Sequence, residues 1–115
     1  PGRKLNGELT LGENIADLGG AKAAFRAYKI SLNGKPSPII DNYTGEQRFF
    51  IGTAQSDRVK FREEIYAMRV ATSVHSPSRF RVDGVIINMK EFHQSFSTKK
   101  GDKLFRPNDE IILIW

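Results

Sequence analysis

The feature that most restricts the fold of this chain is a helical segment at residues 11–31 with two carboxylates on its apolar side. At about 100° per residue, Asp17 falls within roughly 40° of Glu13 around the helix. Three small residues share this sector: Gly20, Ala24 and Ala27. A carboxylate that is buried without a partner is strongly unfavourable. We therefore expect a basic group or a metal ion to meet Glu13 and Asp17, and a neighbouring element to approach closely over the small residues.

A loop at residues 33–38, which contains two prolines, separates this helix from a second one. Thr44 and Gln47 have the spacing of a capping box, so we expect a long helix that begins at residue 44 and ends at about residue 70. Its apolar positions follow helical spacing, with a polar interruption at residues 55–58; they are Phe50, Ala54, Phe61, Ile65 and Met68. We expect this helix to pack against the first.

The last third of the chain mixes helix and strand signals. Residues 75–78 predict a turn, residues 80–87 alternate loosely and favour a partly extended segment, and residues 88–91 cap a short helix that ends near Phe96. The apolar tail at residues 111–115 is expected to pack, as a short strand. The predicted fold is therefore mainly α, with one or two short strands.

Composition excludes several classes of protein. The chain has 115 residues, no cysteine, and 18 Lys and Arg against 13 Asp and Glu, a net charge of +5. This length suits one small domain or part of a larger one. No apolar run is long enough for a membrane span, and disulfide or thiol chemistry is excluded. Because the basic residues are interleaved with acids, we expect no nucleic-acid partner.

The carboxylate pair belongs to a longer motif. Residues 12–20 read GENIADLGG and resemble the Glu-Asn-Ile-Ala-Asp segment of the neprilysin family of zinc metallopeptidases. The resemblance continues in order over essentially the whole chain, through NGELTL at 6–11, EQRFF at 46–50, AQ at 54–55, HSP at 75–77, FRV at 80–82, EF at 91–92 and Trp115. It implies the C-terminal helical part of a thermolysin-like catalytic domain, acting on oligopeptides.

The resemblance also implies roles for four residues. Glu13 is similar to the family's third zinc ligand, and Asp17, one helical turn on, to the carboxylate that orients a zinc-binding histidine. His75 resembles the histidine that stabilises the oxyanion during catalysis. Arg81 resembles the residue that hydrogen-bonds a backbone carbonyl of the substrate. His93 stands at a position that the family does not use, and we expect it to be structural.

The family's His-Glu-x-x-His motif, which supplies two zinc ligands and the general base, is absent from this chain. We therefore expect residues 1–115 to be the C-terminal portion of a catalytic domain whose upstream half is its natural partner. Alone, the chain is predicted to be inactive and to lack the Zn²⁺ that the parent protein would hold. Loss of the upstream half should expose the surface around Gly20, Ala24 and Ala27 and cause self-association.

Three residues depart from the family pattern. Ser56 and Asp57 replace an apolar-Trp pair that lines the pocket for the side chain after the scissile bond, so a hydrophobic substrate preference does not follow for this chain. Ser73 replaces an aspartate two residues before the histidine, which removes a carboxylate that would orient His75.

The lack of cysteine is a further departure from the animal extracellular members, which carry disulfides. It favours a bacterial parent. For that parent we expect a periplasmic, cell-envelope or secreted location rather than a cytoplasmic one.

Two functions of different classes remain open from the sequence. The first is part of a zinc endopeptidase with the roles given above. The second is a non-catalytic helical module that binds peptides or another subunit through the same groove. An upstream His-Glu-x-x-His motif in the parent protein would favour the first function, and its absence would favour the second.

Overall fold

A computed structural model describes residues 4–114, and most of them lie in five α-helices. The elements in chain order are α1 (Gly7–Ser31), α2 (Gly45–Ser56), α3 (Glu63–Thr72), α4 (Ser78–Ile86), α5 (Lys90–Phe96) and a short 3₁₀ turn, η1 (Asn108–Glu110). Within residues 4–114 no strand forms, and the one extended pairing is an isolated bridge between Ile40 and Tyr43. The prediction of a mainly α fold is confirmed. None of these helices is both long and apolar enough to cross a membrane.

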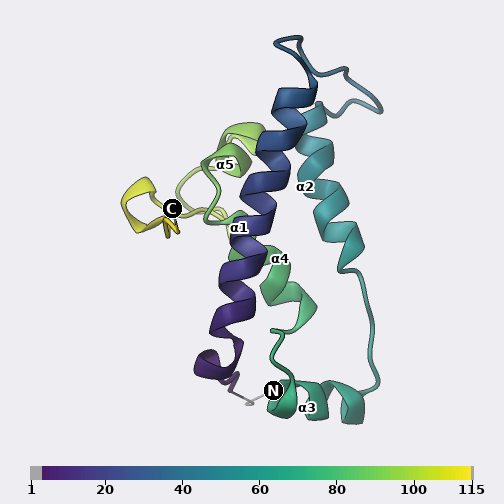
Figure 1. The fold of residues 1–115 in the computed structure, drawn as a ribbon, viewed down its shortest axis with the longest axis vertical. Helices are drawn as coiled ribbons and strands as arrows, with labels where there is room; N and C mark the ends of the chain where they lie inside the picture. Colours follow the sequence, from purple (N-terminus) through teal and green to yellow (C-terminus); the bar gives the residue numbers. More distant parts are fainter. Residues whose placement is uncertain (1–3, 115) are drawn as a thin grey trace.

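Helix α1 extends along the long axis of the molecule and is the element on which the others are arranged (Figure 1). It begins at Gly7, four residues before the predicted start, because the Asn6 side chain caps it by accepting a hydrogen bond from the Leu9 N–H at 3.1 Å. Helix α4 packs along the N-terminal half of α1, and α2 lies beside its C-terminal half. Helix α3 lies across the lower end of the molecule (Figure 1).

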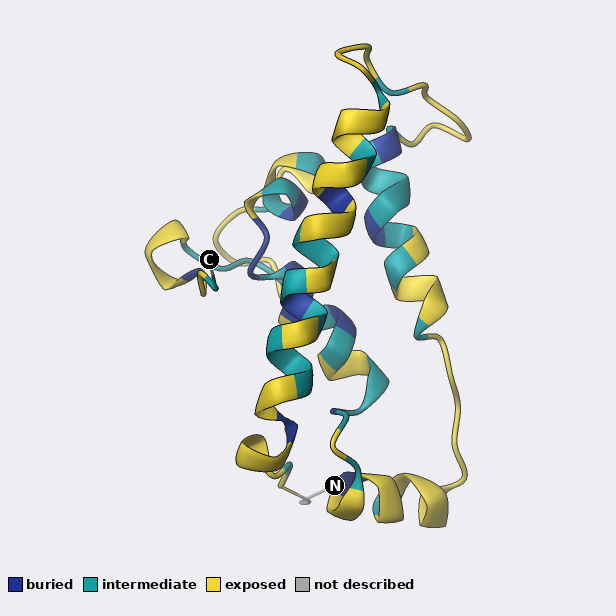
Figure 2. Cartoon of the chain, viewed as in Figure 1, coloured by how far each residue is buried: buried dark blue, intermediate teal, exposed yellow. Residues whose placement is uncertain are grey.

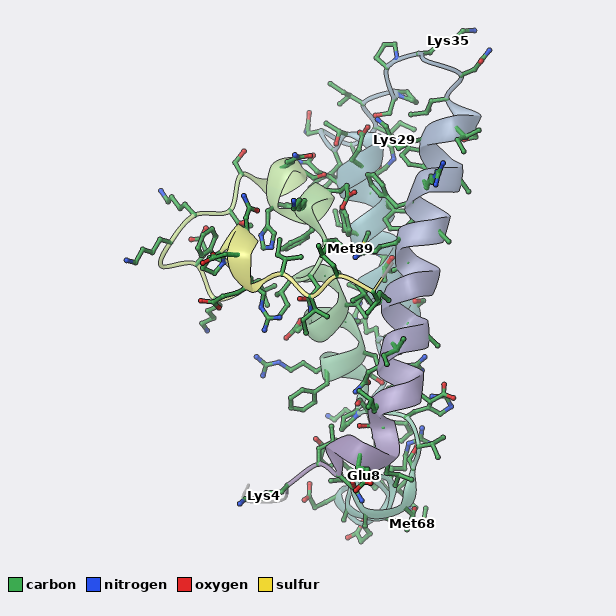
Figure 3. The ribbon with its side chains drawn as sticks, turned by 60° about the vertical axis from the view of Figure 1, so that its left-hand side comes forward. Lys4, Glu8, Lys29, Lys35, Met68 and Met89 are labelled. Atoms are coloured by element: carbon green, nitrogen blue, oxygen red, sulfur yellow. The ribbon has the colours of Figure 1, made fainter. Side chains whose placement is uncertain are left out.

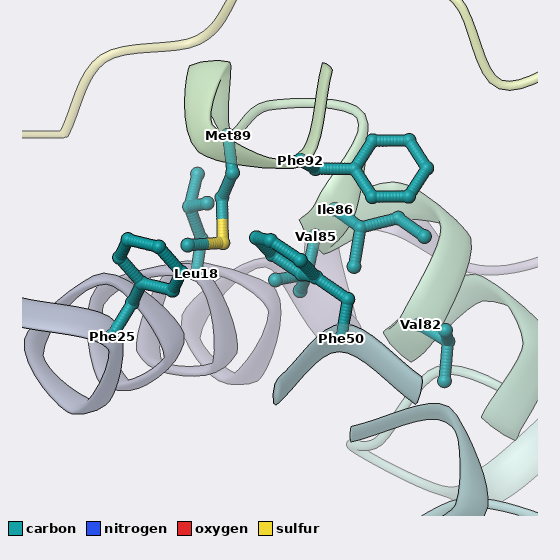
Figure 4. Packing of buried hydrophobic residues seen from close by; sticks show 8 residues of the cluster. All are labelled: Leu18, Phe25, Phe50, Val82, Val85, Ile86, Met89 and Phe92. Atoms are coloured by element: carbon teal, nitrogen blue, oxygen red, sulfur yellow. The ribbon is translucent and has the colours of Figure 1, made fainter. Parts of the chain in front are cut away.

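The core forms where α1, α2, α4 and α5 meet (Figure 4). Its buried side chains are Leu18, Phe25, Phe50, Val82, Val85, Ile86, Met89 and Phe92. Aromatic rings join α1 to α2, with the Phe25 ring 5.1 Å from Phe49 and 5.5 Å from Phe50 between centroids, so the predicted packing of these two helices is confirmed. Met89 lies deep in this core, whereas Met68 on α3 projects outward at the far end of the molecule (Figure 3).

The segment expected to be partly extended, residues 80–87, is helical as far as Ile86, and this prediction was wrong. Val82, Val85 and Ile86 are buried together on one face of α4. The β-branched residues suggested a strand, but helical spacing lets all three reach the core, and this burial outweighs their intrinsic preference.

The single long helix predicted from residue 44 to about residue 70 is two helices, α2 and α3, joined by residues 57–62 without regular structure. The start of the prediction is confirmed, because both hydrogen bonds of the Thr44–Gln47 capping box form. The break coincides with the polar residues 55–58, which have no apolar side chain that could continue the buried face of α2. Beyond it, Ile65 and Met68 are exposed (Figure 2).

The small-residue face of α1 does not receive a neighbouring element among the described residues. Gly20, Ala24 and Ala27 are exposed, and the space where a side chain on Gly20 would begin is open. The reason is that α1 buries the adjoining sector, with Leu18 and Phe25, against the core. The close approach expected over the small residues is therefore absent within residues 4–114, and self-association through this face stays a prediction.

Asn88 links the C-terminal segment to the core through hydrogen bonds. Its side chain is almost fully buried, and its Oδ1 accepts hydrogen bonds from Arg106 Nη1 at 2.7 Å and from the backbone N–H of Ile112 at 2.9 Å. Ile111 is buried, whereas Ile112 and Leu113 are exposed. The tail therefore packs in part, but it forms no strand within residues 111–114. Trp115 lies outside the described residues.

A polar network anchors the loop between α1 and α2. Glu46 accepts hydrogen bonds from Lys29 Nζ at 2.5 Å and from Ser37 Oγ at 2.8 Å. Ser37 Oγ also accepts one from the backbone N–H of Gly45 at 3.0 Å. Gly45 is buried against Tyr28 and Ser37, and a Cβ at this position would overlap both side chains. These contacts lower the pKa of Glu46 from its usual 4.5 to about 2, with the Lys29 hydrogen bond as the largest cause.

This lowered pKa predicts an acid-sensitive contribution to stability. A carboxylate with a depressed folded-state pKa stabilises the fold above its unfolded pKa, and that contribution disappears as the pH falls from about 4.5 toward about 2. Glu46→Gln should lower the free energy of unfolding at neutral pH by about 1 kcal/mol, a value that allows for solvent screening. It should also flatten the pH dependence below about 4.5. Urea denaturation at several pH values measures both effects. The exposed Glu110→Gln is the control, and an equal loss in the two variants would contradict the prediction.

Candidate functional site

The four residues singled out from the sequence come together beside the N-terminal half of α1. Glu13 and Asp17 are one turn apart on α1, His75 lies in the segment between α3 and α4, and Arg81 is in the first turns of α4. The structure arranges them as two pairs, one pair for each carboxylate. Both pairs link α1 to a segment more than 60 residues later in the chain.

Asp17 and Arg81 form a bidentate ion pair. The guanidinium Nε donates to Asp17 Oδ2 and Nη2 donates to Oδ1, both at 2.7 Å. The two side chains are 20% and 30% exposed, so the pair is largely shielded from water. The hydrogen bonds to Asp17 raise the pKa of Arg81 above its usual value, and the guanidinium stays charged. The basic partner expected for Asp17 is therefore present.

Glu13 meets His75 rather than a fully buried cation. Glu13 Oε2 lies 3.1 Å from His75 Nδ1, although the two groups are not aligned as a hydrogen bond. The side chains are 42% and 41% exposed. The expectation that the Glu13 carboxylate is buried was wrong, because the small-residue sector that it shares faces solvent. The carboxylate thus remains open on one side to further groups.

A second set of polar contacts holds His75 in place. Ser76 is buried, and its Oγ donates to Asn14 Oδ1 on α1 at 2.8 Å. Ser73 Oγ accepts from the backbone N–H of His75 at 3.1 Å, so this serine acts on the backbone and not on the ring. The Ser76–Asn14 contact joins residues 62 positions apart, and no local sequence pattern predicts it. Its only signal was that both residues belong to the quoted motifs.

Asp57, which departs from the family pattern, also lies near this site. Its Oδ1 is 4.0 Å from Arg81 Nη1, the guanidinium nitrogen that Asp17 does not use. The distance is within ion-pair range but too long for a hydrogen bond. Among the described residues Nη1 therefore donates no hydrogen bond, and its N–H groups can reach another acceptor.

The described residues do not form a metal site by themselves. Across residues 4–114 no three His, Asp or Glu side chains gather closely enough to hold a metal ion. A catalytic zinc site needs three protein ligands. The donor set present here, one partly exposed carboxylate beside one imidazole, could supply part of such a site but does not complete it.

The sequence matches known peptidases over nearly its whole length. The family model described as peptidase family M13 matches residues 1–111. Neprilysin-3 of Drosophila melanogaster is 42% identical over 107 residues, which cover 90% of this chain and 14% of that protein. Human endothelin-converting enzyme 1 is 42% identical over 110 residues, which cover 93% of this chain and 14% of that protein. The chain thus spans about one seventh of the length of these curated relatives.

The fold matches a solved structure equally well. The crystal structure of the Mycobacterium tuberculosis zinc metalloprotease Zmp1 in complex with an inhibitor superposes with a TM-score of 0.96 at 45% sequence identity. The match covers 100% of this chain and 18% of that chain. The similarity therefore extends to the arrangement of all the described helices.

The bidentate pair predicts strong energetic coupling between α1 and α4. Asp17→Asn and Arg81→Gln should each lower the free energy of unfolding by about 1–3 kcal/mol, because each leaves a largely shielded charge without its partner. The double variant should lose less than the sum of the two, with a coupling of about 0.5–3 kcal/mol. Urea denaturation of the four proteins completes the cycle.

The matched control is the pair Arg79–Asp83 on α4, where Nε and Oδ2 lie 3.0 Å apart and the Arg79 side chain is 83% exposed. Arg79→Gln should change stability by no more than about 0.5 kcal/mol. Additive losses for Asp17→Asn and Arg81→Gln would contradict the coupling.

Proposed function

The chain belongs to peptidase family M13, and from this premise we propose that it is the C-terminal part of the catalytic domain of a zinc metalloendopeptidase that hydrolyses oligopeptides. The observation that carries the proposal is the placement of Glu13 beside His75, with the Asp17–Arg81 pair one helical turn away. Residues from two distant parts of the chain thereby present a carboxylate, an imidazole and a guanidinium on one side of α1.

In the proposed parent protein, Glu13 contributes one carboxylate ligand to Zn²⁺, and two histidines of the upstream half contribute the others. The bound metal would supply Lewis acidity and a water molecule with a pKa lowered to about 7. Glu13 is suited to this role because its carboxylate is partly exposed and accepts no aligned hydrogen bond from residues 4–114. Each Asp17 oxygen keeps a lone pair beyond the one that Arg81 uses, so Asp17 can also orient a ligand histidine.

His75 and Arg81 act on the substrate in this proposal. The His75 imidazole donates a hydrogen bond to the oxyanion that develops on the scissile carbonyl. Arg81 donates from Nη1 to a backbone carbonyl of the peptide while its other two nitrogens remain bound to Asp17. The ion pair therefore holds the guanidinium plane in a fixed orientation before the substrate arrives.

We also propose that the parent protein is bacterial and that it is periplasmic, bound to the cell envelope or secreted. The absence of cysteine supports the bacterial origin, because the animal extracellular members carry disulfides, and it does not bear on the compartment. Similar proteins occur in animals and in bacteria. The two relatives named above are from animals, and the solved structure is from a bacterium.

The proposal predicts that metal binding and activity depend together on the upstream half. The 115-residue chain alone should bind no stoichiometric zinc and cleave no quenched fluorescent peptide, because one carboxylate is too few ligands. Joining the upstream half should restore both properties. In that restored enzyme Glu13→Ala should lose the metal, whereas Glu8→Ala, an exposed residue on the same helix, should keep it. Stoichiometric zinc on the chain alone, or cleavage by it, would contradict the ligand assignment. A parent without a His-Glu-x-x-His motif would contradict the proposal and favour a binding module.

A different result is expected for His75. In the restored enzyme His75→Ala should keep its zinc and lose mainly kcat, by about 10²–10³-fold, because the proposed hydrogen bond forms in the transition state. Metal analysis and steady-state kinetics on the same preparation separate the two effects. A proportional loss of zinc and activity would show that His75 supports the metal instead.

A further inference from the structure

A cavity of about 390 Å³ opens between α3 and the beginning of α4. It is lined by residues 59–61, one face of α3, residues 75–79 and Arg81, so it shares His75 and Arg81 with the site. Figure 1 shows the connection from α2 descending to α3, which lies at the lower end of the molecule. The cavity is therefore continuous with the site but extends beyond it.

The wall of the cavity carries an excess of positive charge. Four of its side chains are basic, and one, Glu63, is acidic. The four are Lys60, Arg69, Arg79 and Arg81. The two arginines on α4 are neutralised by aspartates. For Lys60 and Arg69, no carboxylate lies within 4.0 Å among residues 4–114. Two unneutralised cations thus face one carboxylate.

The Arg69 guanidinium is already oriented. Its Cζ lies 4.8 Å from the centroid of the Phe61 ring, a cation–π contact between α3 and the connection that precedes it. A guanidinium held by its face still presents its N–H edge, which matches the two oxygens of a carboxylate. Phe61 therefore limits the motion of Arg69 without using its hydrogen-bond donors.

We propose that this cavity binds a carboxylate group of the peptide substrate, with Arg69 as the main contact and Lys60 as the second. The inference rests on the proposed function, since it takes peptides as the ligands. The carboxylate belongs either to an acidic side chain or to the C-terminus of the peptide. Glu63 opposes the same group by like-charge repulsion and reduces the affinity.

Binding of short peptides to the 115-residue chain tests the proposal without hydrolysis. The probes are three pentapeptides: Ala-Ala-Glu-Ala-Ala with both ends blocked, its Gln counterpart with both ends blocked, and the Gln peptide with a free C-terminal carboxylate. We expect at least one carboxylate-bearing peptide to bind about fivefold more tightly than the blocked Gln peptide at low ionic strength. Which of the two does so identifies the source of the carboxylate. NMR titration measures the affinities, and added salt at about 0.5 M should reduce the preference.

Variants with opposite effects make the test specific. Arg69→Gln should remove the preference, and Glu63→Gln should increase it. Arg62→Gln is the matched control, because it makes the same charge change next to the cavity on a side chain that does not line it. Lys60→Gln, in the connection between α2 and α3, should reduce the preference. It serves as a second variant if Arg69→Gln unfolds α3, which circular dichroism would show.

Equal affinities for the three peptides would overturn the inference, as would a loss in Arg62→Gln as large as that in Arg69→Gln. The outcome is separable from the proposed function. A parent protein without zinc or hydrolysis would leave the peptide preference of this chain unchanged, whereas an active parent with equal affinities would overturn this inference alone.

Discussion

The ion pair between Asp17 and Arg81 is the contact on which the arrangement of the site depends. It joins α1 to α4 through two residues that are 64 positions apart in sequence. Removing two charges from water is unfavourable, and the pair is stable only because its bidentate geometry satisfies both oxygens of the carboxylate. With the start of α4 held in this way, the segment before it must pass beside α1, and this passage brings His75 to Glu13.

Local signals predicted the helices that begin with a clear cap. The Thr44–Gln47 capping box forms as its spacing indicates, and the helix that follows starts where expected. The end of that helix could not be predicted in the same way. The spacing of apolar residues does not reveal whether another part of the fold packs against them. Phe61 instead stacks with Arg69, and the chain between α2 and α3 has no regular secondary structure. In α4, burial of Val82 and Val85 prevails over a strand preference that a single sequence cannot weigh against packing.

The site was only partly readable from the sequence for a similar reason. The spacing of Glu13 and Asp17 places both on one face of a helix, and this follows from helix geometry alone. Their partners come from a distant segment, so no local pattern connects Asp17 to Arg81. The family motif supplied the order of the important residues, but not their mutual contacts. The Asn14–Ser76 hydrogen bond, which secures the turn, has no signal of its own beyond membership in that motif.

Helix α3 is attached to the rest of the molecule mainly at its two ends. Val70 is its one buried residue, and segments without regular secondary structure precede and follow the helix (Figure 2). An element with so few buried contacts opens at a lower free energy than the core, so its amide protons should exchange first. A ligand that binds against α3 in its closed form therefore shifts the equilibrium between the open and closed forms of this helix toward the closed form. The wall of the cavity can consequently adapt to ligands of different size. Ordering this wall costs free energy, so each ligand binds less tightly than it would to a rigid wall.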